Sequence, residues 1–413
     1  MISIITPTNN PKYLKEAFES LKAQTFQDWE WIIVPNNGVK VNLKDKRIRI
    51  IPFGNSDKIG EIKKFAFSQG RGEILFELDH DDLLTPTALE KVNEVFQDKE
   101  VVFCDSNFAE FFYNHKTKKD WEPNFYNLNY GWKYREVEFY GHKFQEVLGH
   151  EITATSLAMI YWAPNHLRAW RRGAYEEIGG HNPELKVADD HDLCCRTYLY
   201  GKCVHIPECL YLYRIHTTNA WLRFNAEIQD VTQKVRDQYL FDLVLKWCDK
   251  NNYRKLDIGG AFDSPASYES VDLEGADINC DLNEKWPFKD NSIGCIRAFD
   301  ILEHLKDPIH TMNEIYRVLV PGGWLLSLTP STDGRGAFQD PTHISFWNEN
   351  SFWYYTKKGY AKYLHEKFKG RFQAVRIRTE FPYEFQRLNK IPYVRADLIA
   401  LKEGVEVPGL VEI

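Results

Sequence analysis

The amino-acid sequence predicts an α/β protein with two domains, each built on a mostly parallel sheet. Two observations predict this class. Short apolar runs alternate with helical patterns over residues 1–97, and a second series of the same kind begins at Lys255. Strands that alternate with helices form parallel sheets with helices on both faces. The chain has 413 residues, which is enough for two or three domains of about 100–200 residues.

Four strands are expected in the first series, at residues 2–6, 30–34, 47–52 and 73–78. A helix follows the first strand, because Pro11 suits a first turn and an apolar stripe comes after it at Leu14, Ala17, Phe18 and Leu21. Another helix is expected to begin at Pro86. Residues 105–165 are rich in Tyr, Phe, Trp and His and have weak periodicity. We expect an irregular insertion there, which either lines a site or is a packed excursion without function.

A long helical pattern over residues 224–250 predicts a connector between the two series. The expected domains are therefore 1–223 and 251–413. In the second, strands are expected at 255–258, 269–273, 295–299 and 324–328, and a helix at 308–319. Residues 372–380 and 394–401 could close this sheet as an antiparallel pair.

Composition narrows the class of partner and the compartment. The net charge of -7 argues against a nucleic-acid or anionic-membrane partner. The eight cysteines contain no metal-type CxxC pair, and no long apolar run resembles a signal peptide or a membrane span. We expect a cytoplasmic protein with free thiols and no transmembrane segment. The sequence leaves the oligomeric state open.

An apolar strand at residues 73–78 ends in the carboxylates Asp79, Asp81 and Asp82. Ligands of open parallel sheets bind beyond the carboxyl ends of the strands. In extended chain Asp79 and Asp81 point to the same side, and they repel unless a cation lies between them. A hard divalent cation that also binds diphosphate oxygens suits this place. The alternative is an acidic helix N-terminus before Pro86.

Several ordered motifs resemble family-2 glycosyltransferases with the GT-A fold, over roughly residues 1–220. They are Ile4-Ile5-Thr6-Pro7-Thr8-Asn9, the turn Pro35-Asn36-Asn37-Gly38, the segment 58–64, and the strand that ends at Asp79. The resemblance implies that Thr6, Pro7, Asn36, Lys63 and Asp79 contact a nucleotide-sugar donor, a UDP-, GDP- or dTDP-sugar. It also implies that Asp79 and Asp81 hold Mn²⁺ or Mg²⁺. The family usually has aspartate where this chain has Asn36, and an amide can both donate and accept, so the base remains open.

Two later motifs extend this resemblance. In Val187-Ala188-Asp189-Asp190 the residue Asp190 aligns with the general base of inverting transfer to a glycan acceptor. Crowded acidic neighbours are expected to raise its pKa, and a helix N-cap cluster is the alternative. In Tyr211-Leu212-Tyr213-Arg214-Ile215-His216, His216 aligns with a histidine that completes the metal shell and suits manganese better than magnesium. Arg168, Arg171 and Arg172 could bind phosphate or acceptor sugar, or only shield Asp189 and Asp190.

The second series resembles class I S-adenosyl-L-methionine-dependent methyltransferases, which have a Rossmann-like fold, over roughly residues 251–401. The matching segments are Leu256-Asp257-Ile258-Gly259-Gly260, the strand that ends at Asp272, the segment 277–282, Glu303-His304-Leu305 and Pro321-Gly322-Gly323. The resemblance implies that Asp257 and Gly259 shape the methionine end of the cofactor. It implies that Asp272 holds the ribose, and that Asp281 and Leu282 flank the adenine.

The second domain departs from this pattern in two ways. Residues 261–267 are too few for a crossover helix, so the cofactor pocket is either more open or degenerate. No methyl-acceptor base stands out, although His343 could deprotonate a sugar hydroxyl; His304 is interpreted as structural. The favoured hypothesis is a bifunctional enzyme that adds a sugar and O-methylates a sugar. The alternative is a glycosyltransferase with an inactive methyltransferase-like binding module. A nucleic-acid methyltransferase would need a basic face.

Overall fold

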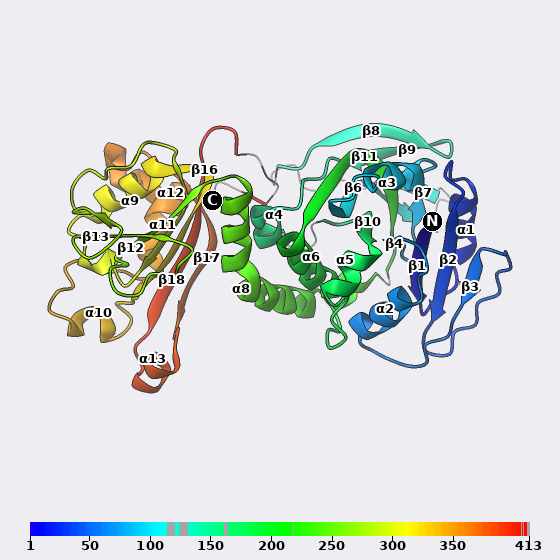
Figure 1. Ribbon diagram of the computed structural model, residues 1–413, viewed down its shortest axis with the longest axis horizontal. Helices are drawn as coiled ribbons and strands as arrows, with labels where there is room; N and C mark the ends of the chain where they lie inside the picture. Colours follow the sequence, from blue (N-terminus) through cyan, green and yellow to red (C-terminus); the bar gives the residue numbers. More distant parts are fainter. Residues whose placement is uncertain are drawn as a thin grey trace. The chain divides into compact units, whose positions relative to one another are not determined.

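The computed structural model describes residues 1–113, 120–123, 131–160, 164–217, 219–405, 407 and 409–410. The chain divides into two compact units, Met1–Leu243 and Val244–Ile413 (Figure 1). The division falls within α8 (Asn225–Lys250), which spans the segment where the connector was expected. No helix in these residues is long and apolar enough to cross a membrane. Each unit is described by itself.

The sheet of the first unit begins with four parallel strands in the order β3-β2-β1-β4. They are β1 (Ile2–Thr8), β2 (Trp29–Pro35), β3 (Ile48–Ile50) and β4 (Ile74–Glu77). The sheet continues through β10 (Arg168–Arg171), β6 (Val101–Tyr113), β11 (Lys202–Ile215) and β5 (Leu83–Leu84). β10 is antiparallel to both β4 and β6. The four strands expected in this series are thus confirmed.

Helices pack on both faces of this sheet, as the strand–helix alternation predicted. The register pairs Trp31 with Ile4 on one face, and Trp170 with Leu75 on the other. On the first face, α1 (Leu14–Lys22) stacks Phe18 on Trp31. On the second face, the rings of α2 (Ile59–Ser68) and α5 (Arg172–Glu177) pack on Trp170. α3 (Ala88–Val95) and α6 (Asp189–Tyr200) also pack against strands of this sheet.

The start of α2 is fixed to the loop that leads into α6. The Gly60 N–H donates to the Leu185 carbonyl at 3.0 Å. A Cβ at Gly60 would lie 1.9 Å from the Asn182 carbonyl oxygen, so this approach requires glycine. The contact holds the acidic first turn of α6 near the carboxyl end of β4.

The expectation of an irregular insertion at 105–165 was wrong for most of that segment. It contains the long strand β6, the short β7 (Asp120–Pro123), the hairpin of β8 (Tyr134–Phe139) and β9 (His142–Val147), and α4 (Ala154–Met159). Strand alternation is hidden in the sequence because polar residues are buried together. Asn107 Nδ2 donates to Glu146 Oε1 at 2.7 Å, and Glu146 is fully buried. Residues 114–119, 124–130 and 161–163 lie outside the described part.

The second unit has one sheet in the order β14-β13-β12-β15-β16-β18-β17. Its strands are β12 (Arg254–Ile258), β13 (Glu269–Asp272), β14 (Ile278–Asn279), β15 (Ile293–Phe299), β16 (Leu319–Pro330), β17 (Phe372–Glu380) and β18 (Tyr393–Ala400). The first five are parallel, and β18 pairs antiparallel with β16 and β17. All expected strands, including the closing antiparallel pair, are confirmed. No helix lies between β12 and β13 in this part of the chain.

The core of this unit forms where two helices pack on the sheet. α9 (Pro308–Val318) and α11 (Glu349–Thr356) contribute Met312, Ile315 and Phe352 to the same buried cluster as β12, β15, β16 and β18. α9 begins after Asp307, whose side chain caps two backbone N–H groups, and Pro308 occupies its first turn. The short helices are η2 (Leu302–His304), α10 (Gly336–Gln339), α12 (Lys358–Ala361), η3 (Lys362–Lys367) and, at the tip of the β17–β18 hairpin, α13 (Glu384–Asn389). α7 (Ala220–Arg223) precedes α8.

Candidate functional site

Thr6, Pro7 and Asn36, which lie on or next to the first two strands, were predicted to contact the donor. The polar side chains among them form hydrogen bonds with other groups of the protein. The Thr6 hydroxyl donates to the Leu78 carbonyl and accepts from Trp31 Nε1, both at 2.8 Å. The Asn36 amide donates to the Ser56 carbonyl at 2.9 Å and accepts from the Ser56 N–H at 3.2 Å. Pro7, next to Thr6, is buried in β1. These side chains therefore fix the strand end and the loops around the site.

The predicted metal residues Asp81 and His216 lie against each other. His216 Nε2 is 2.7 Å from Asp81 Oδ2, and the Tyr13 ring stacks on the imidazole. Burial would raise the pKa of Asp81, but the hydrogen bond from His216 and the nearby imidazoles outweigh it, so the pKa is lowered. The fold thus joins the turn after β4 to the end of β11.

Asp79 lies in a second cluster, with Asp82 and His166, whose ligand atoms are all within 4.8 Å of one another. Asp82 accepts hydrogen bonds from the Tyr211 hydroxyl at 2.8 Å and the Arg214 N–H at 2.7 Å. The His166 ring stacks on Tyr211 with centroids 4.4 Å apart. Sequence reasoning did not select Asp82 or His166 as ligands.

Negative charge accumulates around Asp79. Burial, together with the Glu77 and Asp81 carboxylates, raises the pKa of Asp79 to about 6, although Lys63 opposes the shift. Three carboxylates on alternate residues at the end of one strand repel one another. A divalent cation bound there would relieve this repulsion, so the residues present fit such an ion.

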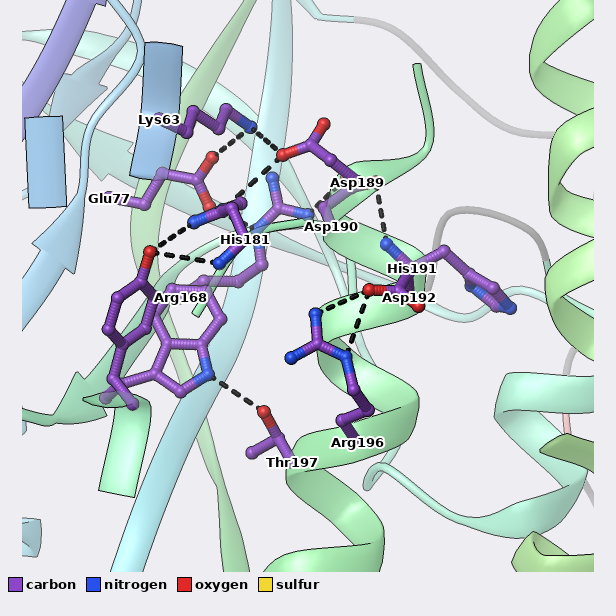
Figure 2. A network of polar contacts seen from close by, with 12 residues as sticks. Lys63, Glu77, Arg168, His181, Asp189, Asp190, His191, Asp192, Arg196 and Thr197 are labelled. Carbon is purple, nitrogen blue, oxygen red and sulfur yellow. Dashed lines mark hydrogen bonds and ion pairs between the residues drawn. The ribbon is translucent and has the colours of Figure 1, made fainter. Parts of the chain in front are cut away.

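A buried ionic network lies beside this turn (Figure 2). Glu77, at the end of β4, is 1% exposed. Its Oε1 lies 2.5 Å from Lys63 Nζ of α2, and its Oε2 lies 2.9 Å from Arg168 Nε of β10. Burial would raise the pKa of Glu77, but Arg168 and Lys63 outweigh it and lower the pKa to about 2. Lys63 thus pairs with a buried carboxylate beside the turn after β4.

The network continues to the first turn of α6. Asp189 Oδ2 lies 3.5 Å from Lys63 Nζ and 3.4 Å from His181 Nε2. Asp190 Oδ2 lies 2.5 Å from Arg168 Nη1. Burial lowers the pKa of His181 to about 3, so its imidazole is neutral. Of the two aspartates, Asp189 is buried and Asp190 is one-third exposed.

The expected pKa shift of Asp190 is corrected by this geometry. Crowded carboxylates were expected to raise it. Burial acts in that direction, but Arg168 and Lys63 outweigh burial and lower the pKa of Asp190 below its usual range. The pKa that rises, to about 6, is that of Asp189, because it is buried. Arg168 forms ion pairs with both Glu77 and Asp190.

In the second unit, Gly259 and Asp272 lie at the carboxyl edge of the sheet. Gly259 has φ +79, and a Cβ there would lie 2.7 Å from the Ile301 side chain, so glycine is required. Asp272 ends β13 and is partly exposed; its oxygens accept from the Ala261 and Leu273 N–H groups at 3.3 and 2.7 Å. Leu273, which sequence reasoning passed over, is 65% exposed beside it.

The other predicted cofactor residues lie deeper or further out. Both carboxylate oxygens of the buried Asp257 accept from Arg297 Nη1 at 2.8 Å, which joins β12 to β15. Leu282 is buried in the core cluster of this unit. Asp281 is exposed, and its Oδ1 accepts from the Asn283 N–H at 2.8 Å.

His343 lies in a cleft of about 210 Å³. The lining residues are Asp300, Glu303, His304, Pro330, Gly336, Gln339, Asp340, His343, Phe385, Gln386, Ile391 and Tyr393. Burial raises the pKa of Glu303 to about 7. Sequence reasoning had selected His343 but not Glu303.

Two family models match the chain. Residues 3–150 match glycosyl transferase family 2, and residues 232–371 match a methyltransferase domain. The chain contains a family-2 glycosyltransferase domain and a methyltransferase domain. It is therefore a transferase.

Two relatives named as glycosyltransferases agree with the first of these matches, and one solved structure is also similar to the chain. Glycosyltransferase GlyG of Streptococcus pneumoniae is 24% identical over 224 residues, which cover 52% of this chain and 70% of that protein. An uncharacterized glycosyltransferase of Nostoc sp. is 28% identical over 261 residues, 59% of this chain and 75% of the relative. The crystal structure of S. aureus TarS 1–349 in complex with UDP covers 61% of this chain and 70% of its own, at 15% identity and a TM-score of 0.42.

Glu77 and His181 of the glycosyltransferase domain were missed by sequence reasoning. A signal for Glu77 was present, because a charged residue within an apolar strand is seldom buried unless it is paired. It also precedes Asp79 by two residues and so points to the same side. His181 carried no comparable signal, because its partners Tyr175 and Asp189 come from two different helices, α5 and α6.

We expect Glu77→Gln to lower the free energy of unfolding by about 3–5 kcal/mol, because it leaves Lys63 and Arg168 buried with less compensating charge. Glu73→Gln, at the exposed start of the same strand, is the matched control and should change it by less than about 0.5 kcal/mol. Urea unfolding followed by tryptophan fluorescence measures both.

The difference in unfolding free energy between the wild type and Glu77→Gln should depend on pH, and the sign of this dependence follows from the pKa of Glu77. The folded pKa of Glu77, about 2, lies below the ordinary 4.5. The stability that its ionised carboxylate contributes is therefore fully present above pH 4.5 and is lost as the pH falls through about 2. The stability gap between the wild type and Glu77→Gln should therefore narrow below pH 4.5. Equal stability of Glu77→Gln and Glu73→Gln at neutral pH would contradict the role given to the network.

Proposed function

We propose that this chain is a bifunctional enzyme of glycan assembly. Its glycosyltransferase domain transfers a sugar from a nucleotide-sugar donor to a glycan acceptor, with inversion and with a divalent cation. Its methyltransferase domain O-methylates a sugar with S-adenosyl-L-methionine. The observation that carries the proposal is that carboxylates gather at the carboxyl edge of each parallel sheet, where ligands of such sheets bind.

We take 1–223 and 251–413 as the two catalytic domains and 224–250 as the connector. Joining them keeps the product of one site at a high effective concentration for the other. A cytoplasmic location is part of the proposal, because all eight cysteines are free, as expected in a reducing compartment.

Asp79, Asp81 and His216 hold the cation in this proposal. Two ligands of one octahedral cation lie about 3 Å apart, and Asp81 Oδ2 and His216 Nε2 are 2.7 Å apart. The cation supplies positive charge to the diphosphate leaving group. Lys63 and Arg168 neutralise Glu77 next to this turn, so that its carboxylate does not repel the diphosphate.

We expect Asp81→Asn to lower glycosyl transfer at least about a hundredfold, the scale of losing charge stabilisation at a leaving group. His216→Gln should weaken Mn²⁺ binding, measured by the electron paramagnetic resonance of free Mn²⁺ in the presence of nucleoside diphosphate. His166→Gln is the matched comparison, because it tests the cluster of Asp79, Asp82 and His166. If His166→Gln weakens Mn²⁺ binding and His216→Gln does not, the cation site must be assigned to that cluster instead. Full activity in EDTA would exclude metal dependence.

Asp190 is the general base in this proposal. It lies on the first turn of α6 and is the more exposed of the two neighbouring aspartates, so an acceptor hydroxyl can reach it. The ion pair with Arg168 keeps the carboxylate ionised and oriented. Its Oδ1 is also fixed, by the His191 N–H at 2.8 Å.

We expect Asp190→Asn to lower turnover about 10²–10⁴-fold, because no carboxylate then removes the proton of the acceptor hydroxyl. The dissociation constant of the donor should stay nearly unchanged, as measured by calorimetry. Glu184→Gln, an exposed change in the preceding loop, is the control and should keep full turnover. Unchanged turnover in Asp190→Asn would reject the residue. Retained anomeric configuration, seen by NMR of the product, would reject inversion.

The methyltransferase domain holds S-adenosyl-L-methionine, which supplies the methyl group, through residues at its sheet edge. Asp272 accepts from backbone N–H groups, and each carboxylate oxygen can accept further bonds from the ribose hydroxyls. Gly259 lets the backbone approach the ligand, and the segment of Asp281 and Leu282 flanks the adenine. Asp257 acts through Arg297, which holds the strands in place.

We expect Asp272→Ala in the full chain to weaken cofactor binding about tenfold or more, since each lost charged hydrogen bond contributes about 1.5–3 kcal/mol. Glu274→Ala, an exposed change in the same turn, is the matched control. Calorimetry with S-adenosyl-L-methionine measures both. No binding by the folded wild type would favour the alternative, a glycosyltransferase with an inactive binding module, which the short segment between β12 and β13 also suggests.

A further inference from the structure

The cleft of the second unit holds a cluster that the resemblance does not explain. Glu303, His304 and His343 each offer a ligand atom, and these atoms all lie within 4.8 Å of one another. We propose that Glu303, His304 and His343 form a site for a divalent first-row transition cation, separate from the cation of the glycosyltransferase domain. Two imidazoles and one carboxylate favour such a cation over Mg²⁺ or Ca²⁺, which prefer all-oxygen ligands.

The carboxylate of Glu303 supplies the first argument. Glu303 is 2% exposed, and its Oε1 is buried with no hydrogen-bond partner among the described residues. Its Oε2 accepts from the Thr329 hydroxyl at 2.6 Å. A buried acceptor without a partner costs about 1–3 kcal/mol, and more when it is charged. A cation bound at Oε1 removes this cost.

The orientation of the two imidazoles supplies a second, independent argument. His343 Nδ1 lies 3.0 Å from the Ala337 carbonyl, and His304 Nδ1 lies 3.2 Å from the Thr342 carbonyl. Carbonyl oxygens accept, so each Nδ1 carries the proton and each Nε2 offers its lone pair. A metal-binding histidine commonly donates its other ring N–H to such a carbonyl. Both side chains therefore have a tautomer that can bind a cation through Nε2.

The chain fixes these three side chains well. Glu303 and His304 lie in η2, and the Ile344 and Ser345 N–H groups donate to the Glu303 carbonyl at 2.8 and 2.9 Å. These bonds hold the segment of His343 against η2. The His304 and His343 rings meet edge to face, with centroids 4.9 Å apart. Such preorganisation is expected of a binding site.

Three protein ligands leave coordination positions open, as in catalytic metal sites. All three ligand residues line the cleft of about 210 Å³, so a small molecule bound in it would lie next to the cation. A hydroxyl of the methyl acceptor bound there would have its pKa lowered by the cation and would release its proton to solvent. That role rests on the proposed methyltransferase function, whereas binding of the cation does not. It would also account for the lack of an evident acceptor base in the sequence.

The test is a Co²⁺ titration of the full chain, followed by the visible absorption that imidazole ligands change. The chain that carries both Asp81→Asn and His166→Gln serves as the background, so that neither candidate cation site of the glycosyltransferase domain contributes. We expect one Co²⁺ to bind, and Glu303→Gln, His304→Gln and His343→Gln each to weaken binding at least tenfold. His310→Gln, an exposed histidine of α9, is the control and should bind as before.

Thermal unfolding and calorimetry with S-adenosyl-L-methionine accompany each variant. His304→Gln leaves the buried Glu303 in place and so guards against loss of the fold. Unchanged Co²⁺ binding in the three variants, or no binding up to about 1 mM Co²⁺, would overturn the proposal. Cation binding without cofactor binding would instead reject the methyltransferase function and leave the cation site standing.

Discussion

One buried carboxylate organises the glycosyltransferase domain. Glu77 lies between Lys63 of α2 and Arg168 of β10, so three separate elements meet at a single charge. The same two cations extend to Asp189 and Asp190, which places the first turn of α6 beside the end of β4. Two cations face three carboxylates in this network, and the excess negative charge agrees with the raised pKa of Asp189. The carboxylates at the end of β4 and on the first turn of α6 are thus positioned by one set of ion pairs.

Stability alone does not account for such a network. A buried ion pair loses much of its Coulomb energy to desolvation, and apolar residues of similar volume are often as stable. The arrangement does determine which carboxylates stay ionised. Arg168 lowers the pKa of Asp190, whereas burial raises the pKa of Asp189. Two adjacent aspartates of α6 thereby differ in pKa, because one is buried and the other pairs with Arg168 of β10.

The local sequence pattern predicted most of the helices and strands. It failed where the burial or the pKa of a side chain depends on partners that are distant in the sequence. Strand and helix periods are short-range, so the four parallel strands of the first sheet and the antiparallel pair that closes the second could be found from the sequence. The pKa shift of Asp190 could not, because Asp190 lies on a helix and its partner Arg168 lies 22 residues earlier, on β10. The hairpin of β8 and β9 was hidden for a related reason: Glu146 is buried only because Asn107 and Arg135 bond to it. Glu303 was missed because His343 comes 40 residues later in the chain.

In the proposed cofactor site, the short segment between β12 and β13 would leave much of the cofactor binding to a single side chain, Asp272. A crossover helix after Gly259 would direct backbone N–H groups and a positive dipole end at the methionine carboxylate. Here that helix is missing from the described chain, and the Ala261 N–H points to Asp272 Oδ2 at 3.3 Å. This N–H and that of Leu273 thus orient the carboxylate that we propose binds the ribose. Phe262 and Leu273 are exposed, so an adenosine bound against them would bury apolar surface. Affinity in this domain then depends on the ribose and adenine end of the ligand, and much less on its amino-acid end.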